Sequence, residues 1–129
     1  MKELVIKKSK TLDKYLGLLT EISLYDISEK KIGRAKLRFV PNMYGKDFYI
    51  LMSLVVNEKN RDKKYGSYLI EHVKNFLEEE QLSCFLTDST GENIINKKNN
   101  QRFYSRHGWI NDGMHYFYPN IFSYNNQNS

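Results

Sequence analysis

Cysteine, proline and long apolar runs are scarce in this chain of 129 residues, and each scarcity excludes something. The one cysteine, Cys84, excludes an internal disulfide framework and a zinc site built from several cysteines. The two prolines and seven glycines are few enough to serve as markers of turns. No apolar run approaches the roughly 20 residues that a membrane-spanning helix needs, and the first residues have no apolar signal-peptide core. We therefore expect a cytoplasmic protein with no membrane partner.

What the chain contains is typical of a globular domain with a basic surplus. Hydrophobic residues make up 40% and charged residues 27%, so wholesale disorder is not expected. The length predicts one domain over residues 1–122, followed by a disordered polar tail over 123–129. A net charge of +5 indicates an anionic partner, but it does not choose between nucleic acid, a membrane surface and a phosphate-bearing small molecule.

The hydrophobic pattern of the first half predicts mainly strands. An apolar run at residues 4–6 is strand-like, and leucines at helical spacing predict one short helix over Thr11–Leu19. Alternation of apolar and polar residues predicts strands over Thr20–Ser28 and Ile32–Val40, which we expect to form an antiparallel hairpin. The polar side of the second of these strands is basic, with Arg34, Lys36 and Arg38.

The second half predicts a central strand, a long helix and shorter elements. The almost continuously apolar run Phe48–Val56 predicts a central strand covered on both faces. After a polar, basic segment, the residues that follow Ser67 have the spacing of an amphipathic helix. The remaining predicted elements are a strand at Cys84–Thr87, a short helix at Asn99–Arg106 ended by Gly108, and strands at Trp109–Ile110 and Tyr116–Tyr118 around a turn at Asn111–Gly113. This order predicts an α/β (α+β) sheet with helices on its faces.

The segment between the central strand and the long helix carries the most information about function. Arg61, Lys63 and Lys64 place cations before the helix, and Gly66 allows close approach of the backbone to a ligand. The helix N-terminus adds unpaired N–H groups and partial positive charge, so the segment can hold a pyrophosphate. It is neither a Walker A loop nor a dinucleotide fingerprint. A solvated loop followed by an ordinary helix cap explains the same residues.

Two motifs resemble the GNAT superfamily of acyl-CoA-dependent N-acetyltransferases. Val56–Ile70 resembles that family's strand–loop–helix signature, in which a valine precedes a loop of the form [Q/R]-x-x-G-x-[G/A]. Arg61 takes the first position of the loop and Gly66 the last, whereas Lys64 stands where the family usually has its first glycine. Asn100–Trp109 resembles the family's "helix, F-Y, three residues, G-[F/W]" segment. The two motifs in this order are a much stronger indication than either alone.

The resemblance covers about Thr20–Tyr118 and has consequences for fold and ligand. It implies a GNAT-like, mixed and mostly antiparallel central sheet flanked by helices, with a shortened N-terminal helical region. It implies acetyl-CoA as the co-substrate and direct transfer of the acetyl group to a primary amine. The central strand and the strand at Phe85 would splay apart to admit the pantetheine arm. The implied CoA contacts are the backbone of Leu54, Val55 and Val56 for the pantetheine, and Arg61, Asp62, Lys63, Lys64, Tyr65, Gly66 and Ser67 for the pyrophosphate. The family's usual asparagine before the second helix would be Asn99 or Asn96, neither at the common spacing, and a helix cap explains either residue equally well.

The resemblance also implies one catalytic residue. Tyr104 matches the family's general acid, which protonates the departing CoA thiolate. A phenol with a pKa near 10 is a proton donor throughout the physiological range, although a core aromatic would explain the same residue. The general base stays unassigned, because the central strand has no carboxylate between Phe48 and Val56. The candidates are Asp88, Glu21, Asp26 and a water relay to solvent.

The other chemically active side chains are explained by structural roles. We expect His107, beside Gly108, to favour the end of its helix. We expect Cys84, in an apolar strand, to belong to the core. His72, His107 and His115 do not have metal-ligand spacing, so we predict no metal.

Two rival functions remain open at this stage. The charge of +5, the basic strand and the abundant Tyr and Phe suit a nucleic-acid-binding module. The lysine in the loop and the short N-terminus suit a catalytically degenerate relative that binds a partner protein. The acceptor amine is open between a small molecule, a protein and an RNA-linked amine, and a homodimer is allowed.

Overall fold

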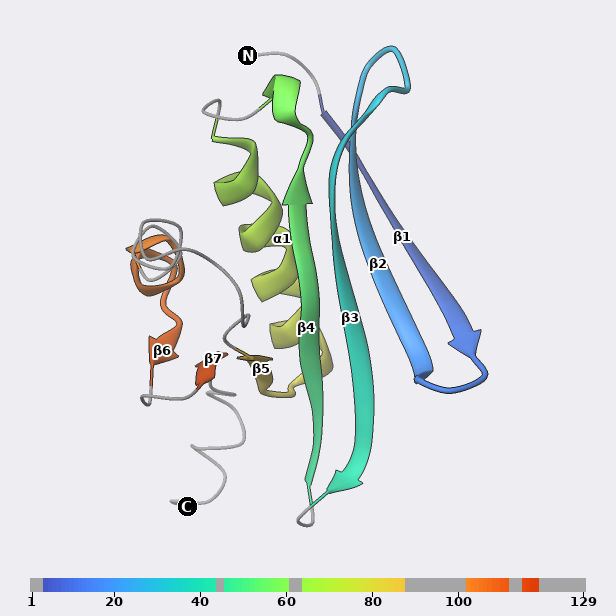
Figure 1. The fold of residues 1–129 in the computed structure, drawn as a ribbon, viewed down its shortest axis with the longest axis vertical. Coiled ribbons are helices and arrows are strands. Elements are labelled where there is room, and N and C mark those ends of the chain that lie inside the picture. Colours follow the sequence, from blue (N-terminus) through green and yellow to red (C-terminus); the bar gives the residue numbers. More distant parts are fainter. Residues whose placement is uncertain (1–3, 44–45, 61–63, 88–101, 112–114, 119–129) are drawn as a thin grey trace.

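One mixed sheet of seven strands forms the centre of the molecule, in the order β1-β2-β3-β4-β5-β7-β6 (Figure 1). The computed structural model describes residues 4–43, 46–60, 64–87, 102–111 and 115–118. The strands are β1 (Leu4–Asp13), β2 (Gly17–Asp26), β3 (Lys31–Met43), β4 (Lys46–Val56), β5 (Cys84–Thr87), β6 (Ile110–Asn111) and β7 (His115–Tyr118). The helices are the short 3-10 helix η1 (Glu58–Asn60), α1 (Tyr65–Glu80) and a helical segment at residues 102–106.

The pairing of the strands confirms the predicted mixed, mostly antiparallel sheet. Strands β1 to β4 form consecutive antiparallel ladders. Only β4 and β5 are parallel, and β7 is antiparallel to both β5 and β6. The predicted hairpin is confirmed as β2 and β3, in which Ile22 lies opposite Ala35.

Helix α1 covers one face of the sheet and closes the core (Figure 1). Leu69, Val73 and Leu77 of its apolar stripe are at most 1% exposed, as are Leu37 and Leu51 on the strands. Burying each such side chain stabilises the fold by roughly 1.5–3 kcal/mol. The amphipathic pattern therefore predicted this helix correctly, although it begins two residues before Ser67, at Tyr65.

The predicted N-terminal helix over Thr11–Leu19 is wrong, because β1 and β2 form a hairpin there. Leu12 is 80% exposed, so the helical spacing of the leucines was fortuitous. The Asp13 carboxylate accepts hydrogen bonds from the N–H groups of Tyr15 (2.8 Å) and Leu16 (2.9 Å). Gly17 follows with φ +81°, which glycine adopts without strain. This turn and the ladder replace the shortened helical region, and β2 starts earlier than the predicted strand at Thr20.

Strand β4 is central in the sheet, as predicted, but it is covered on one face only. Tyr49 and Leu51 are buried at 3% and 1%, whereas Met52 and Val55 are 40% and 43% exposed. The continuous apolar run gave no sign of this difference between the faces. The side of β4 that faces away from α1 is therefore accessible.

The C-terminal elements follow the prediction with shifted ends. Residues 102–106 are helical, β6 begins at Ile110 and β7 at His115; residues 99–101 and 112–114 lie outside the described part of the chain. Gly108 has φ +87° and donates its N–H to Ser105, while Trp109 donates to Tyr104. This pair of bonds is a Schellman motif, which confirms Gly108 as the helix-ending residue. Among the described residues, no helix is long and apolar enough to cross a bilayer.

Candidate functional site

Strands β4 and β5 diverge after a short parallel contact, as the resemblance implied. They pair only at Tyr49–Cys84 and Ile50–Phe85. Beyond these pairs Leu86 and Thr87 of β5 are bonded to β7, and β4 continues along β3. Met52 is an extra residue in β4 at this point, because Leu51 and Ser53 lie opposite consecutive residues of β3. Such a bulge bends its strand and ends regular pairing, so the two strands part beyond Ile50 and leave a gap in the pairing of the sheet.

The N-terminus of α1 follows the end of β4 and presents hydrogen-bond donors. The first intrahelical bond runs from the Tyr68 N–H to the Lys64 carbonyl, at 3.1 Å. The N–H groups of Tyr65, Gly66 and Ser67 therefore have no acceptor within the helix. Lys64 caps the helix with φ 64° and ψ 16°, the left-handed conformation that glycine adopts most easily. The lysine thus keeps the backbone shape that the family's usual glycine would allow.

A hollow of about 340 Å³ lies at this helix end and joins the two sequence motifs. It is lined by Val56, Asn60, Lys64, Tyr65, Gly66, Ser67, Phe103 and Arg106. Its described lining residues include two cations and no carboxylate, beside the positive end of the helix dipole. These features fit a phosphate-bearing ligand. A larger hollow of about 630 Å³ lies at the β1–β2 turn, away from both motifs.

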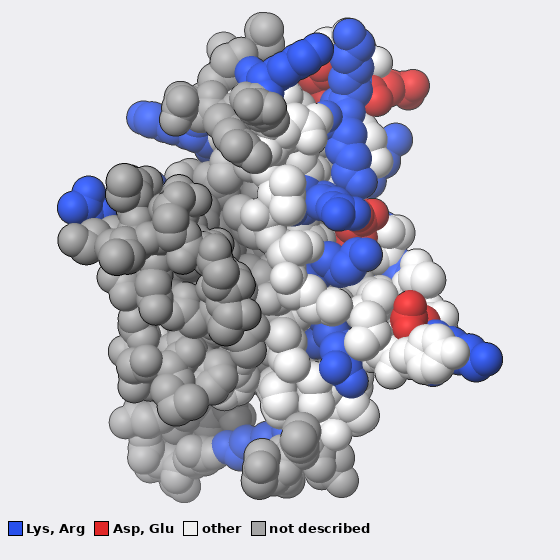
Figure 2. Space-filling view, viewed as in Figure 1, with Lys and Arg blue, Asp and Glu red and all other residues white. Residues whose placement is uncertain are grey.

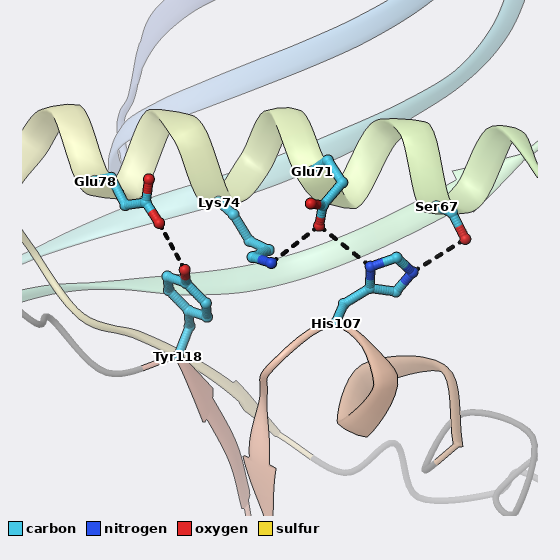
Figure 3. Close-up of polar contacts among 6 residues, drawn as sticks. All are labelled: Ser67, Glu71, Lys74, Glu78, His107 and Tyr118. Atoms are coloured by element: carbon cyan, nitrogen blue, oxygen red, sulfur yellow. Dashed lines mark hydrogen bonds and ion pairs between the residues drawn. The ribbon is translucent and has the colours of Figure 1, made fainter.

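A row of polar side chains fastens the second motif to α1 (Figure 3). His107 lies 3.0 Å from the Ser67 hydroxyl through Nε2 and 3.2 Å from the Glu71 carboxylate through Nδ1. Lys74 forms an ion pair with the same carboxylate at 3.0 Å. Because a carboxylate only accepts hydrogen bonds, Nδ1 of His107 donates to Glu71, and a second hydrogen bond joins Nε2 to the Ser67 hydroxyl. His107 thereby holds a residue that lines the hollow.

The acidic groups of this row are tied to their partners. Burial works to raise the pKa of Glu71, but the hydrogen bonds and charges of Lys74 and His107 hold it below its ordinary value. Farther along α1, the Tyr118 hydroxyl donates to Glu78 at 2.8 Å. Burial and then the Glu78 carboxylate raise the pKa of Tyr118. The row therefore fixes β7 and the 102–106 helix against α1.

The structure brings together the described part of the predicted CoA contacts. Leu54 and Val56 are half-buried and Val55 is exposed at the end of β4. Val56 and the four predicted residues from Lys64 to Ser67 line the same hollow. The four others, Arg61, Asp62, Lys63 and Asn99, lie outside the described residues.

Tyr104 lies in the core beside the hollow. It is 8% exposed, and its ring packs against those of Phe103 (5.2 Å) and Trp109 (5.6 Å). From the same helix, Phe103 and Arg106 line the hollow. This packing also suits a structural aromatic.

The candidate bases on β2 have other partners. Glu21 forms ion pairs with Lys31 (3.4 Å) and Arg34 (3.6 Å). Asp26 accepts hydrogen bonds from the backbone of Ser28 and Lys30 in a turn. Asp88 lies outside the described residues.

Cys84 lies in the core, as predicted. It is fully buried, and burial raises the pKa of its thiol. Within the described segments, no three His, Cys, Asp or Glu side chains are grouped as metal ligands would be.

Sequence reasoning missed several residues of the site. Phe103 and Arg106 lie in the quoted second motif, so their position could have been inferred from it. Asn60 and the contacts of His107 had no signal in the sequence, because Ser67 and Glu71 are 40 and 36 residues away along the chain.

Comparison with known proteins agrees with this geometry. Residues 20–111 match the model of a family described as an acetyltransferase (GNAT) domain. No curated relative matches the sequence. One similar structure is a glucosamine N-acetyltransferase region of a fungal multi-domain β-N-acetylglucosaminidase, with 15% identity and a TM-score of 0.71 over 88% of this chain and 18% of that chain.

Two further structures have the same fold. An acetyltransferase of the GNAT family from Staphylococcus aureus has 19% identity and a TM-score of 0.57, over 78% of this chain and 66% of that chain. A chain of the KacTA–DNA complex has 14% identity and a TM-score of 0.68, over 98% of this chain and 99% of that chain.

Proposed function

Because the chain belongs to the GNAT acetyltransferase family, we propose that it is an N-acetyltransferase that transfers the acetyl group of acetyl-CoA directly to a primary amine. The observation that carries the proposal is the hollow at the start of α1, where the two motifs meet beside the gap between β4 and β5. A binding module with no CoA ligand would not need this combination.

The proposal assigns each part of acetyl-CoA to one part of the chain. The pyrophosphate binds the N–H groups of Tyr65–Ser67, with Lys64 and Arg106 supplying positive charge. Arg61, Asp62, Lys63 and Asn99 keep the CoA-binding role that the motifs indicate. The pantetheine arm lies along the backbone of Leu54–Val56, in the gap toward β5.

In the proposed reaction the amine nitrogen attacks the thioester carbonyl, and the bond between carbonyl carbon and sulfur breaks. Tyr104 donates its proton to the departing thiolate. The amine loses its own proton to a base that we assign to no side chain.

Titration calorimetry with acetyl-CoA tests the proposal, and we expect a micromolar dissociation constant. Transfer to a polyamine, to a lysine-containing peptide and to a peptide with a free N-terminus is followed as release of the CoA thiol.

Tyr104→Phe should reduce turnover by about 10²-fold and change acetyl-CoA affinity by less than about twofold. Tyr118→Phe is the matched control, since both tyrosines are 8% exposed and Tyr118 lies on β7, outside the second motif. No detectable binding of acetyl-CoA would refute the function, and equal losses in the two variants would leave Tyr104 a structural role.

A further inference from the structure

The face of the sheet opposite α1 carries a column of cations. The strand registers place three rows of side chains on it, which are Lys7–Ser23–Arg34–Val55, Ser9–Glu21–Lys36–Ser53 and Thr11–Leu19–Arg38–Ile50. Ala35 and Leu37, which alternate with the cations of β3, are fully buried on the α1 side. Figure 2 shows Lys and Arg side chains following one another down this face over β3. We call Lys7, Arg34, Lys36 and Arg38 the basic face.

Local contacts neutralise only part of this charge. Glu21 is the one carboxylate in the three rows, and it forms an ion pair with Arg34 and a second with Lys31. Arg38 donates from Nε to the Leu16 carbonyl at 2.9 Å, and Lys7 lies over the ring of Tyr25. Neither the Leu16 carbonyl nor the Tyr25 ring carries a negative charge, so these contacts leave the positive charges of Arg38 and Lys7 in place. The basic face therefore keeps an attraction for anions.

The spacing of the cations fits an extended acidic chain. Arg34, Lys36 and Arg38 recur at every second residue, about 7 Å apart. A peptide lying along β3 in extended conformation has the same repeat, so acidic side chains at alternate positions would each meet one cation. Exposed Met52 and Val55 border the column on β4 and offer apolar contact to such a peptide.

The same face suits a single-stranded nucleic acid less well. Such ligands need aromatic platforms on which bases stack. Of the described aromatics beside these rows, Tyr25 is already covered by Lys7, and Phe48, opposite Val40, packs edge-on against Phe85. The basic face also repels small polycationic amines.

The basic face adjoins the gap assigned to the pantetheine arm. Val55 lies directly opposite Arg34, and Ser53 directly opposite Lys36. An amine held beside these pairs would therefore be close to the end of β4.

We propose that the basic face binds an extended acidic segment of the acceptor, so that the acetylated amine belongs to a peptide or protein with acidic residues beside it. The assignment of that segment to an acceptor rests on the acetyltransferase function proposed above, whereas binding of the acidic segment does not.

Fluorescence anisotropy with a labelled peptide in which Glu alternates with Ser tests the proposal. The double variant Arg34→Gln/Lys36→Gln should weaken binding about tenfold. Lys8→Gln/Lys10→Gln is the matched control, because it removes the same charge at the same spacing from the neighbouring α1 side of β1, where these lysines pair with Glu79 and Glu80. The control should change binding less than about threefold, through general charge alone. Lys36→Glu is a second variant, and the described residues give Lys36 no hydrogen bond or ion pair whose loss would disturb folding.

Further probes separate the alternatives. A peptide with the same residues but its Glu in one block should bind more weakly than the alternating peptide. Equal affinity for the two peptides, or equal losses in the two double variants, would overturn the proposal. Tighter binding of an oligothymidine of equal charge would overturn it in favour of nucleic acid. Acetyl-CoA is titrated into the same variants, so that failure of CoA binding is recognised independently of the peptide result.

Discussion

At the scale of single residues, the backbone conformation of Lys64 lowers the stability of the fold. Its left-handed backbone (φ 64°) is about 1–2 kcal/mol less favourable for a residue with a Cβ atom than for glycine. Lys64→Gly should therefore raise the free energy of unfolding by about 1 kcal/mol, after the greater freedom of glycine in the unfolded chain is allowed for. Urea denaturation measures this as a higher midpoint with an unchanged slope.

Lys64→Ala is the control, since it removes the ammonium group and keeps the Cβ atom. Its stability should stay close to that of the parent, and a gain equal to that of the glycine variant would contradict the strain argument. Both variants should lose the same several-fold affinity for acetyl-CoA if the ammonium group contacts phosphate, because both lack it.

At the scale of elements, the ladder between β3 and β4 depends on Gly33. A Cβ atom there would lie 2.6 Å from the Val55 carbonyl oxygen, so the strands would have to separate. Gly33→Ala should lower the free energy of unfolding by about 1–3 kcal/mol, as overpacking does. Gly66→Ala is the control, because its Cβ would make an ordinary 3.5 Å contact with the Phe103 ring. Thermal unfolding should show a loss for the first variant only, and matching losses would contradict the close-approach argument.

The hairpin of β1 and β2 shows that strand pairing can override a helical spacing of apolar residues. Leucines at helical intervals favoured a helix, but the Asp13 turn and the ladder to β2 satisfy the backbone of these residues in a sheet. No helix of the described residues covers the sheet face opposite α1 (Figure 1), where Arg34 is exposed and Lys36 and Arg38 are half-buried.

At the scale of the whole molecule, folding stability should fall as the pH decreases from about 7 to 5.5. Burial and then the positive charge of Lys8 hold the pKa of His72 below its ordinary value of 6.5. The unfolded chain therefore takes up a proton at this position before the folded chain does, and acid favours unfolding. His72→Gln should show a smaller decrease over this range in urea denaturation at several pH values.

Below about pH 5 the two proteins should behave alike, since the lowered pKa of Glu71 acts in both. Identical pH dependence between 7 and 5.5 would contradict the assignment to His72.

The two motifs together specified much of the site before the structure was known. They predicted a ligand site at the start of α1, and they implied the divergence of β4 from β5 that the strand pairing shows. The motifs did not show that the ring of Tyr104 packs into the core, or that His107 contacts Ser67. The His107–Ser67 contact joins residues 40 positions apart, and such contacts leave no local periodicity in the sequence.

Composition and short local patterns were enough to predict the amphipathic helix α1, the central strand β4 and the position of the loop between them. Each of these follows from composition or from a short pattern that repeats along one element. Tertiary structure alone decided that residues 11–13 and 17–19 are strands, that Met52 bulges where β4 leaves β5, and that Arg34, Lys36 and Arg38 lie on an accessible face. Cross-strand registers and the packing of α1 on one side of the sheet fix these features, and both are set by residues distant in the chain.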